Sequence, residues 1–123
     1  MTDAGLLLGL HHVQVTCPPG SEDLLRRFYV GVIGMTEVTK PPALAARGGV
    51  WFEAATFQIH CGVEPEFVPA RRAHPCIAAS DVDELARRCE AAGLPVRWDE
   101  HIEGVRRFHT DDTVGNRIEL QQV

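Results

Sequence analysis

The chain runs through one order of sequence patterns twice, and this internal repeat limits its possible folds more than any other feature. A strand-like stretch at 8–17, with apolar and polar residues alternating toward its end, is followed by an amphipathic helical stretch and three strand-like stretches, and the same order returns from residue 74. Equivalent residues keep their spacing, since 48 positions separate His12 from His60 and 45 separate His74 from Glu119. We therefore expect an α+β fold of two βαβββ modules, with a cupped mixed sheet and helices on its outer face.

The 123 residues are enough for a single domain with a real core. Module 1 covers about 8–64, a proline-broken linker covers 65–73, and module 2 covers about 74–122. Ser21 and Ser80 are expected to cap the two helices. The domain prediction is thus 1–123 as one unit.

Composition excludes several partners. The formal net charge of −5 argues against nucleic acid or an anionic membrane surface, and no stretch of about 18 apolar residues predicts a membrane span. The N-terminus lacks the basic region of a secretory signal, and the four cysteines form no C-x-x-C pair. Reduced thiols in a cytoplasmic protein are expected.

Strand alternation places chemically active residues on one face of the sheet. Successive side chains on a strand point to opposite faces, so His11 and His12 cannot share a role, and His11 is expected at the sheet margin or under a helix. The face that includes His12 carries the polar residues of four strands. They are His12, Gln14, Gln58, His60, His74, Cys76, Arg117 and Glu119.

Two interpretations of this polar face stay open. An antiparallel sheet with one solvated face would account for glutamine and arginine. It accounts less well for three histidines and one glutamate at positions matched by the repeat, because histidine is not a favoured strand residue. Imidazole and carboxylate groups from separate strands suit a divalent ion such as Zn, Ni, Co, Mn or Fe.

At these residues the sequence resembles the vicinal oxygen chelate superfamily, which includes glyoxalases, bleomycin resistance proteins and ring-cleaving dioxygenases. The likeness extends over almost the whole chain, through "HHVQV", "FYVGVIGM", "HPCIAASDVDEL" and "DDTVGNRIEL". The closing Gly-Asn-Arg-Ile-Glu-Leu is its most specific part. The resemblance implies paired βαβββ modules, with a metal ligand on the first and last strand of each module.

The resemblance also implies site residues. His12, His74 and Glu119 match three ligand positions, and His60 stands at the fourth, as a ligand, a general base or a polar wall residue. Glu119 or His60 would move a proton. The expected substrate pocket is lined by Gln14, Gln58, Cys76, Arg117 and His109, although a structural role for His109 and a filler role for Cys76 are also open.

The implied function is a metal-dependent lyase or isomerase of the glyoxalase type. Its ion would act as a Lewis acid on a small oxygen-chelating substrate and stabilise an enolate-like intermediate. Three alternatives are a metal-free protein that binds an antibiotic or another small molecule, an Fe- or Mn-dependent dioxygenase, and a glutathione-transferring resistance enzyme. Relatives of this length also imply a homodimer, with its metal site formed within one chain or across two.

Overall fold

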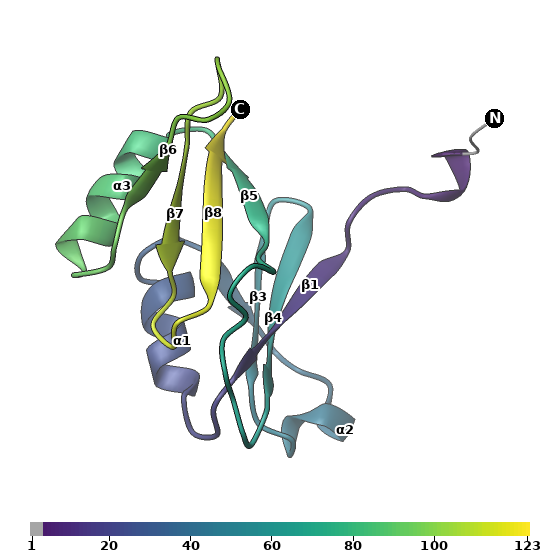
Figure 1. Cartoon of the computed structure of the whole chain (residues 1–123). Coiled ribbons are helices and arrows are strands. Elements are labelled where there is room, and N and C mark those ends of the chain that lie inside the picture. Colours follow the sequence, from purple (N-terminus) through teal and green to yellow (C-terminus); the bar gives the residue numbers. More distant parts are fainter. Residues whose placement is uncertain (1–3) are drawn as a thin grey trace.

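The computed structural model describes residues 4–123 and shows two consecutive βαβββ units (Figure 1). A short 3₁₀ helix, η1 (Ala4–Leu6), precedes them. The first unit consists of β1 (His12–Cys17), α1 (Glu22–Tyr29), β2 (Thr36–Val38), α2 (Pro42–Ala45), β3 (Val50–Ala54) and β4 (Phe57–Val63). The second consists of β5 (Cys76–Ala79), α3 (Val82–Ala91), β6 (Arg97–Asp99), β7 (Arg107–Asp111) and β8 (Arg117–Gln122).

Each unit forms its own four-stranded mixed sheet. Sheet A has the order β1-β4-β3-β2, and sheet B has the matching order β5-β8-β7-β6. In both sheets the opening strand runs parallel to the closing strand, and the other pairs are antiparallel. The equivalence of β4 and β8 inferred from the repeat is confirmed, as is the α+β class with two βαβββ modules.

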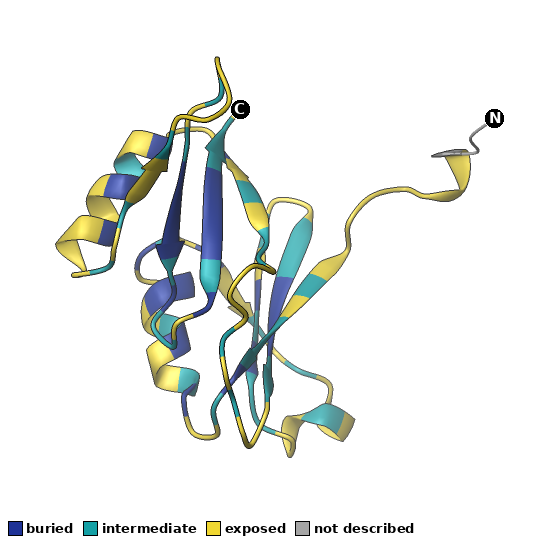
Figure 2. Cartoon of the chain, viewed as in Figure 1, coloured by how far each residue is buried: buried dark blue, intermediate teal, exposed yellow. Residues whose placement is uncertain are grey.

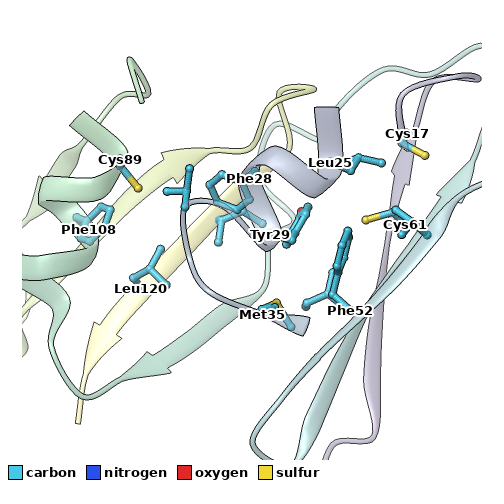
Figure 3. Packing of buried hydrophobic residues seen from close by; sticks show 14 of the residues in the cluster. Cys17, Leu25, Phe28, Tyr29, Met35, Phe52, Cys61, Cys89, Phe108 and Leu120 are labelled. Atoms are coloured by element: carbon cyan, nitrogen blue, oxygen red, sulfur yellow. The ribbon is translucent and has the colours of Figure 1, made fainter. Parts of the chain in front are cut away.

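One apolar cluster joins the two units. Helix α1 lies between the sheets, so that Phe28 and Tyr29 face a core that continues into Phe52 on β3 and Leu120 on β8 (Figure 3). Burial is concentrated on α1 and on the inner strands β4, β7 and β8 (Figure 2). Because the core is shared, the position of one sheet depends on its packing through α1 against the other.

The helix caps differ from the sequence prediction. Ser21 precedes α1 but does not cap it through its side chain, because its Oγ donates a 2.6 Å hydrogen bond to the Pro18 carbonyl. Asp81, rather than Ser80, caps α3 by accepting the Glu84 N–H at 3.1 Å. Each of these hydrogen bonds spans three residues, so local side-chain–backbone hydrogen bonds compete for the helix ends.

Two further details depart from expectation. The expected βαβββ order has no helix between its second and third strands, but Pro42 begins the short helix α2 there, where a fixed φ and a missing N–H are tolerated. His74 lies just before β5 rather than opening it. The Glu119 N–H binds the Pro75 carbonyl at 3.0 Å, which still holds this segment against β8.

The N-terminal arm leaves the body of the molecule. It extends from the start of β1 into open space (Figure 1), and Leu6, Leu7, Leu8 and Leu10 on it are 79%, 83%, 98% and 64% exposed. The four cysteines are all free. Within residues 4–123, no helix combines the length and apolar character that crossing a membrane requires.

Candidate metal centre

Two imidazoles and one carboxylate converge on the polar face of sheet B. Glu119 on β8 lies opposite His109 on β7 in the antiparallel register, and His74 precedes β5 on the other side of β8. One ligand atom from each residue lies within 4.8 Å of the other two. In residues 4–123 this is the one group of three or more His, Cys, Asp and Glu side chains with that geometry.

The two carboxylate oxygens of Glu119 have different surroundings. Oε1 lies 2.9 Å from Nε2 of His74 and 3.3 Å from Nε2 of His109. Oε2 accepts a 3.0 Å hydrogen bond from Arg107, whose other terminal nitrogen donates to Asp99 at 3.0 Å. One oxygen therefore faces the imidazoles, while a guanidinium holds the second.

This pairing keeps Glu119 ionised although it is buried. Burial raises the pKa of the carboxyl group, but the hydrogen bonds from His74 and Arg107 more than offset this effect, and the pKa lies below its ordinary value. An ionised carboxylate is the form that binds a metal.

His74 has an acceptor at each ring nitrogen. Its Nδ1 lies 2.6 Å from the Arg72 carbonyl oxygen, and its Nε2 lies 2.9 Å from Glu119. A neutral imidazole has one N–H and cannot donate to both. An imidazolium would donate to both acceptors; with a cation at Nε2, Nδ1–H would remain on the carbonyl and the Nε2 lone pair would bind the ion.

His109 suits the same role. Burial and the positive charge of Arg117 lower the pKa of its imidazole, in spite of the opposing effect of Glu119. The neutral form, which has a free lone pair, then prevails at neutral pH. Two neutral imidazoles and one carboxylate fit Zn, Ni, Co, Mn or Fe and leave coordination positions open for a substrate.

His12 and His60 lie together on sheet A, away from this cluster. The ring of His60 stacks between His12, with centroids 4.1 Å apart, and Trp51, with centroids 3.8 Å apart. Its Nε2 lies 2.7 Å from Oε1 of Gln58. Within one chain the structure therefore unites His74 with Glu119 but brings neither His12 nor His60 to them.

His11 is not separated from His12 as strand alternation predicted. Since β1 begins at His12, the preceding residue is free of the strand's pleat, and the two Nδ1 atoms lie 2.9 Å apart at the exposed sheet margin. The predicted opposite faces are wrong here, whereas the predicted place at the margin is confirmed.

Of the expected pocket residues, Gln14 and Arg117 share a cavity of about 460 Å³ with His74, between the edge of β1 and the linker. Gln58 instead contacts His60 on sheet A. Cys76 pairs with Glu119 in the strand register, and partial burial together with that carboxylate raises the pKa of its thiol to about 11. The Cys76 thiol thus stays protonated at neutral pH.

Sequence reasoning placed His109 in the pocket and missed it as a candidate ligand. A signal was present, because His109 shares one face of its strand with the charged residues Arg107 and Asp111. What was missing was the register that sets His109 opposite Glu119, which depends on the length of the turn between the two strands.

Comparisons with known proteins agree with this fold. The chain is 42% identical to a glyoxalase family protein of known structure from Bacillus anthracis, with a TM-score of 0.90, covering 94% of this chain and 95% of that one. A lactoylglutathione lyase from Agrobacterium tumefaciens is 22% identical, with a TM-score of 0.72 and coverage of 93% and 92%. An antibiotic binding protein from Streptomyces sp. CB03234 is 20% identical, with a TM-score of 0.69 and coverage of 91% and 94%. Neither a scan of protein-family models nor a search of curated proteins finds a match.

Proposed function

Because the chain belongs to the glyoxalase/bleomycin resistance/dioxygenase superfamily, also called the vicinal oxygen chelate superfamily, we propose that it is a metal-dependent lyase or isomerase of the glyoxalase type. Its substrate would be a small molecule with neighbouring oxygen atoms. The observation that carries the proposal is the convergence of His74, His109 and Glu119 within 4.8 Å. A divalent ion at this point would supply Lewis acidity toward the substrate oxygens.

The residues around the ion would bind it and hold its ligands in place. His74, fixed by the Arg72 carbonyl, and His109 would present Nε2 lone pairs, while Glu119 would present Oε1. Arg107 would keep Oε2 in place. Burial of His109 and Glu119 limits competition by water.

We assign the proton transfer to Glu119 rather than to His60. The Glu119 carboxylate is ionised and borders the proposed metal position, so it can accept a proton from a bound substrate. His60 is covered on both ring faces by His12 and Trp51, and its Nε2 faces Gln58. In this chain His60 has the contacts of a polar wall residue.

We further propose that the protein is a homodimer. The arm with four exposed leucines is an apolar segment that a second copy would cover. The same assembly would bring His12 of one copy to the His74 cluster of the other, with His60 beside it as a wall residue. A cytoplasmic location is proposed from the four free cysteines.

Metal binding is the decisive test. Protein purified without chelator should contain a divalent metal, and Zn, Ni, Co or Mn added to stripped protein should raise the melting temperature by mass action. His74→Ala and Glu119→Gln should abolish the rise, while the control His101→Ala, a change at an exposed histidine of the same module, should retain it. A flat response of the wild type to all four metals would overturn the enzyme proposal and favour the metal-free binding protein.

Activity would separate the remaining branches. Metal-loaded protein should convert dicarbonyl–thiol adducts or epimerise acyl-CoA esters without consuming oxygen. Oxygen uptake with catechols that requires Fe or Mn would instead assign the dioxygenase branch.

A further inference from the structure

We infer that a second pocket, between α2 and the polar face of sheet A, binds the carboxylate or phosphate group of a small aromatic ligand. The pocket measures about 230 Å³, and Gln14, Lys40, Leu44, Arg47, Trp51 and Gly62 lie in its wall. None of these residues belongs to the His74 cluster. The inference therefore goes beyond the proposed metal chemistry and does not require a metal.

The loop that bounds this pocket is fixed at both ends. Pro41 and Pro42 lead into α2, and Gly48 and Gly49 adopt positive φ angles of 75° and 83° as the chain turns into β3. A hydrogen bond from Lys40 Nζ to the Gly48 carbonyl ties the ends together. The loop thus holds its two basic residues at defined places in the wall.

The charge of the pocket is unusual for this chain. The whole protein carries a formal net charge of −5, yet the charged residues in this wall are Lys40 and Arg47, both basic. In residues 4–123 neither forms an ion pair, whereas six other arginines do: Arg26, Arg87, Arg88, Arg97, Arg106 and Arg107.

Donor capacity remains for an anion. An ammonium group has three N–H donors, and Lys40 uses one of them on Gly48. Arg47 is exposed, and its planar guanidinium matches a carboxylate or phosphate. Nearby, the carboxylate of Glu22 accepts the Gly49 N–H at 2.8 Å and lies outside the pocket wall.

The rest of the wall suits a flat apolar group. Trp51 is held rigidly by its stack on His60, whose ring is nearly parallel at 3°. Leu44 adds apolar surface, and Gly62 lets the Gln14 side chain lie against the strand, since its amide is 2.8 Å from where a Cβ at that glycine would stand. An aromatic ring can contact Trp51 while its acidic substituent reaches Lys40 and Arg47.

Phenyl phosphate is the probe, and stripped protein in chelator is the sample. In a Trp98→Phe background Trp51 is the only tryptophan. Phenyl phosphate should quench its fluorescence with saturation, and Lys40→Gln and Arg47→Gln should each weaken binding about fivefold or more. The control Arg27→Gln, at an exposed arginine outside the pocket, should not weaken it. Benzyl alcohol should bind far more weakly.

A second readout uses the single lysine of the chain. Phenyl phosphate should slow acylation of Lys40, followed by peptide mass spectrometry. Equal losses in all three charge variants, equal binding of benzyl alcohol, or unprotected acylation of Lys40 would each overturn the inference. Metal binding is absent from both assays, so their failure leaves the proposed enzyme function intact.

Discussion

The hydroxyl group of Tyr29 donates a 2.6 Å hydrogen bond to Oδ2 of Asp112, 83 positions later in the chain. Asp112 also accepts the backbone N–H of Val114 at 3.0 Å and of Asn116 at 2.9 Å. The Asn116 side chain donates onward to the Thr16 carbonyl at 2.8 Å. This network connects α1 and β1 of module 1 to the turn that leads into β8, and so positions the strand that carries Glu119.

Removing the network should destabilise the fold. Tyr29→Phe should lower the free energy of unfolding by about 1–2 kcal/mol, because a buried carboxylate loses a donor, and Asp112→Ala by about 3 kcal/mol, because several donors lose their acceptor. Urea denaturation of stripped protein measures both values. If the double variant loses as much free energy of unfolding as the two single variants together, the two residues are not coupled.

Arg107→Met should move metal binding to higher pH. Burial raises the pKa of Glu119, and the hydrogen bonds from His74 and Arg107 reverse that effect, so removing Arg107 raises the pKa. Protons then compete with the ion at a higher pH. In calorimetric titrations with Zn between pH 7.5 and 5, Arg107→Met should lose affinity for Zn at a higher pH than the wild type does.

Arg97→Gln is the matched control, because Arg97 pairs with Asp111 on the same sheet and makes no contact with Glu119. Its pH profile should follow the wild type. An unchanged profile for Arg107→Met would contradict the role assigned to Arg107.

His60 should make stability depend on pH. Burial and the neighbouring histidines lower its pKa from 6.5 to about 4. Between pH 6.5 and about 4, His60 binds a proton in the unfolded chain but stays neutral in the folded chain. The contribution of His60 to the free energy of unfolding is therefore fully present above pH 6.5 and is lost as the pH falls toward 4. Measured in chelator, His60→Phe should remove about 1–3 kcal/mol of this loss.

Other groups also titrate in this range, including His109, so the comparison is made between variant and wild type. Phenylalanine retains the stack on Trp51. His101→Phe, at an exposed position, should keep the wild-type pH dependence. If the free energy of unfolding of wild type and of His60→Phe falls equally with pH, His60 is not the cause of the pH dependence.

Mixing of inactive chains tests the dimer and its site. Light scattering should give twice the chain mass of 13.6 kDa. If sites form across two chains, His12→Ala alone should weaken metal binding, and mixing it with Glu119→Gln should restore binding, since half the sites of a mixed dimer combine an intact His12 with an intact Glu119. If sites form within one chain, His12→Ala should bind metal like the wild type, and mixing should add nothing.

The leucine arm can be tested in the same assay. Leu7→Ser with Leu8→Ser should raise the monomer fraction, because both side chains are exposed and a partner would bury them. Leu24→Ser, at an exposed leucine of α1, is the matched control. Equal dimer dissociation constants for both variants would place the interface elsewhere.

The sequence alone determined the architecture. Period-two alternation and the repeated order of strands and helix identified two βαβββ modules, and the two modules form sheets of matching strand order. The same alternation placed Glu119 on the polar face of β8. These properties are local or nearly so, because alternation follows from backbone geometry within each strand.

Only the tertiary structure decided which polar residues meet. His109 joins His74 and Glu119 because strand register sets it opposite Glu119, and register depends on turn length rather than on side-chain pattern. His12 and His60 are equally well placed by alternation, but on sheet A the ring of His60 stacks between His12 and Trp51, because sheet A packs as a separate layer across α1. Sequence periodicity specifies the face on which a side chain lies, and its partners are selected by contacts between residues distant in the chain.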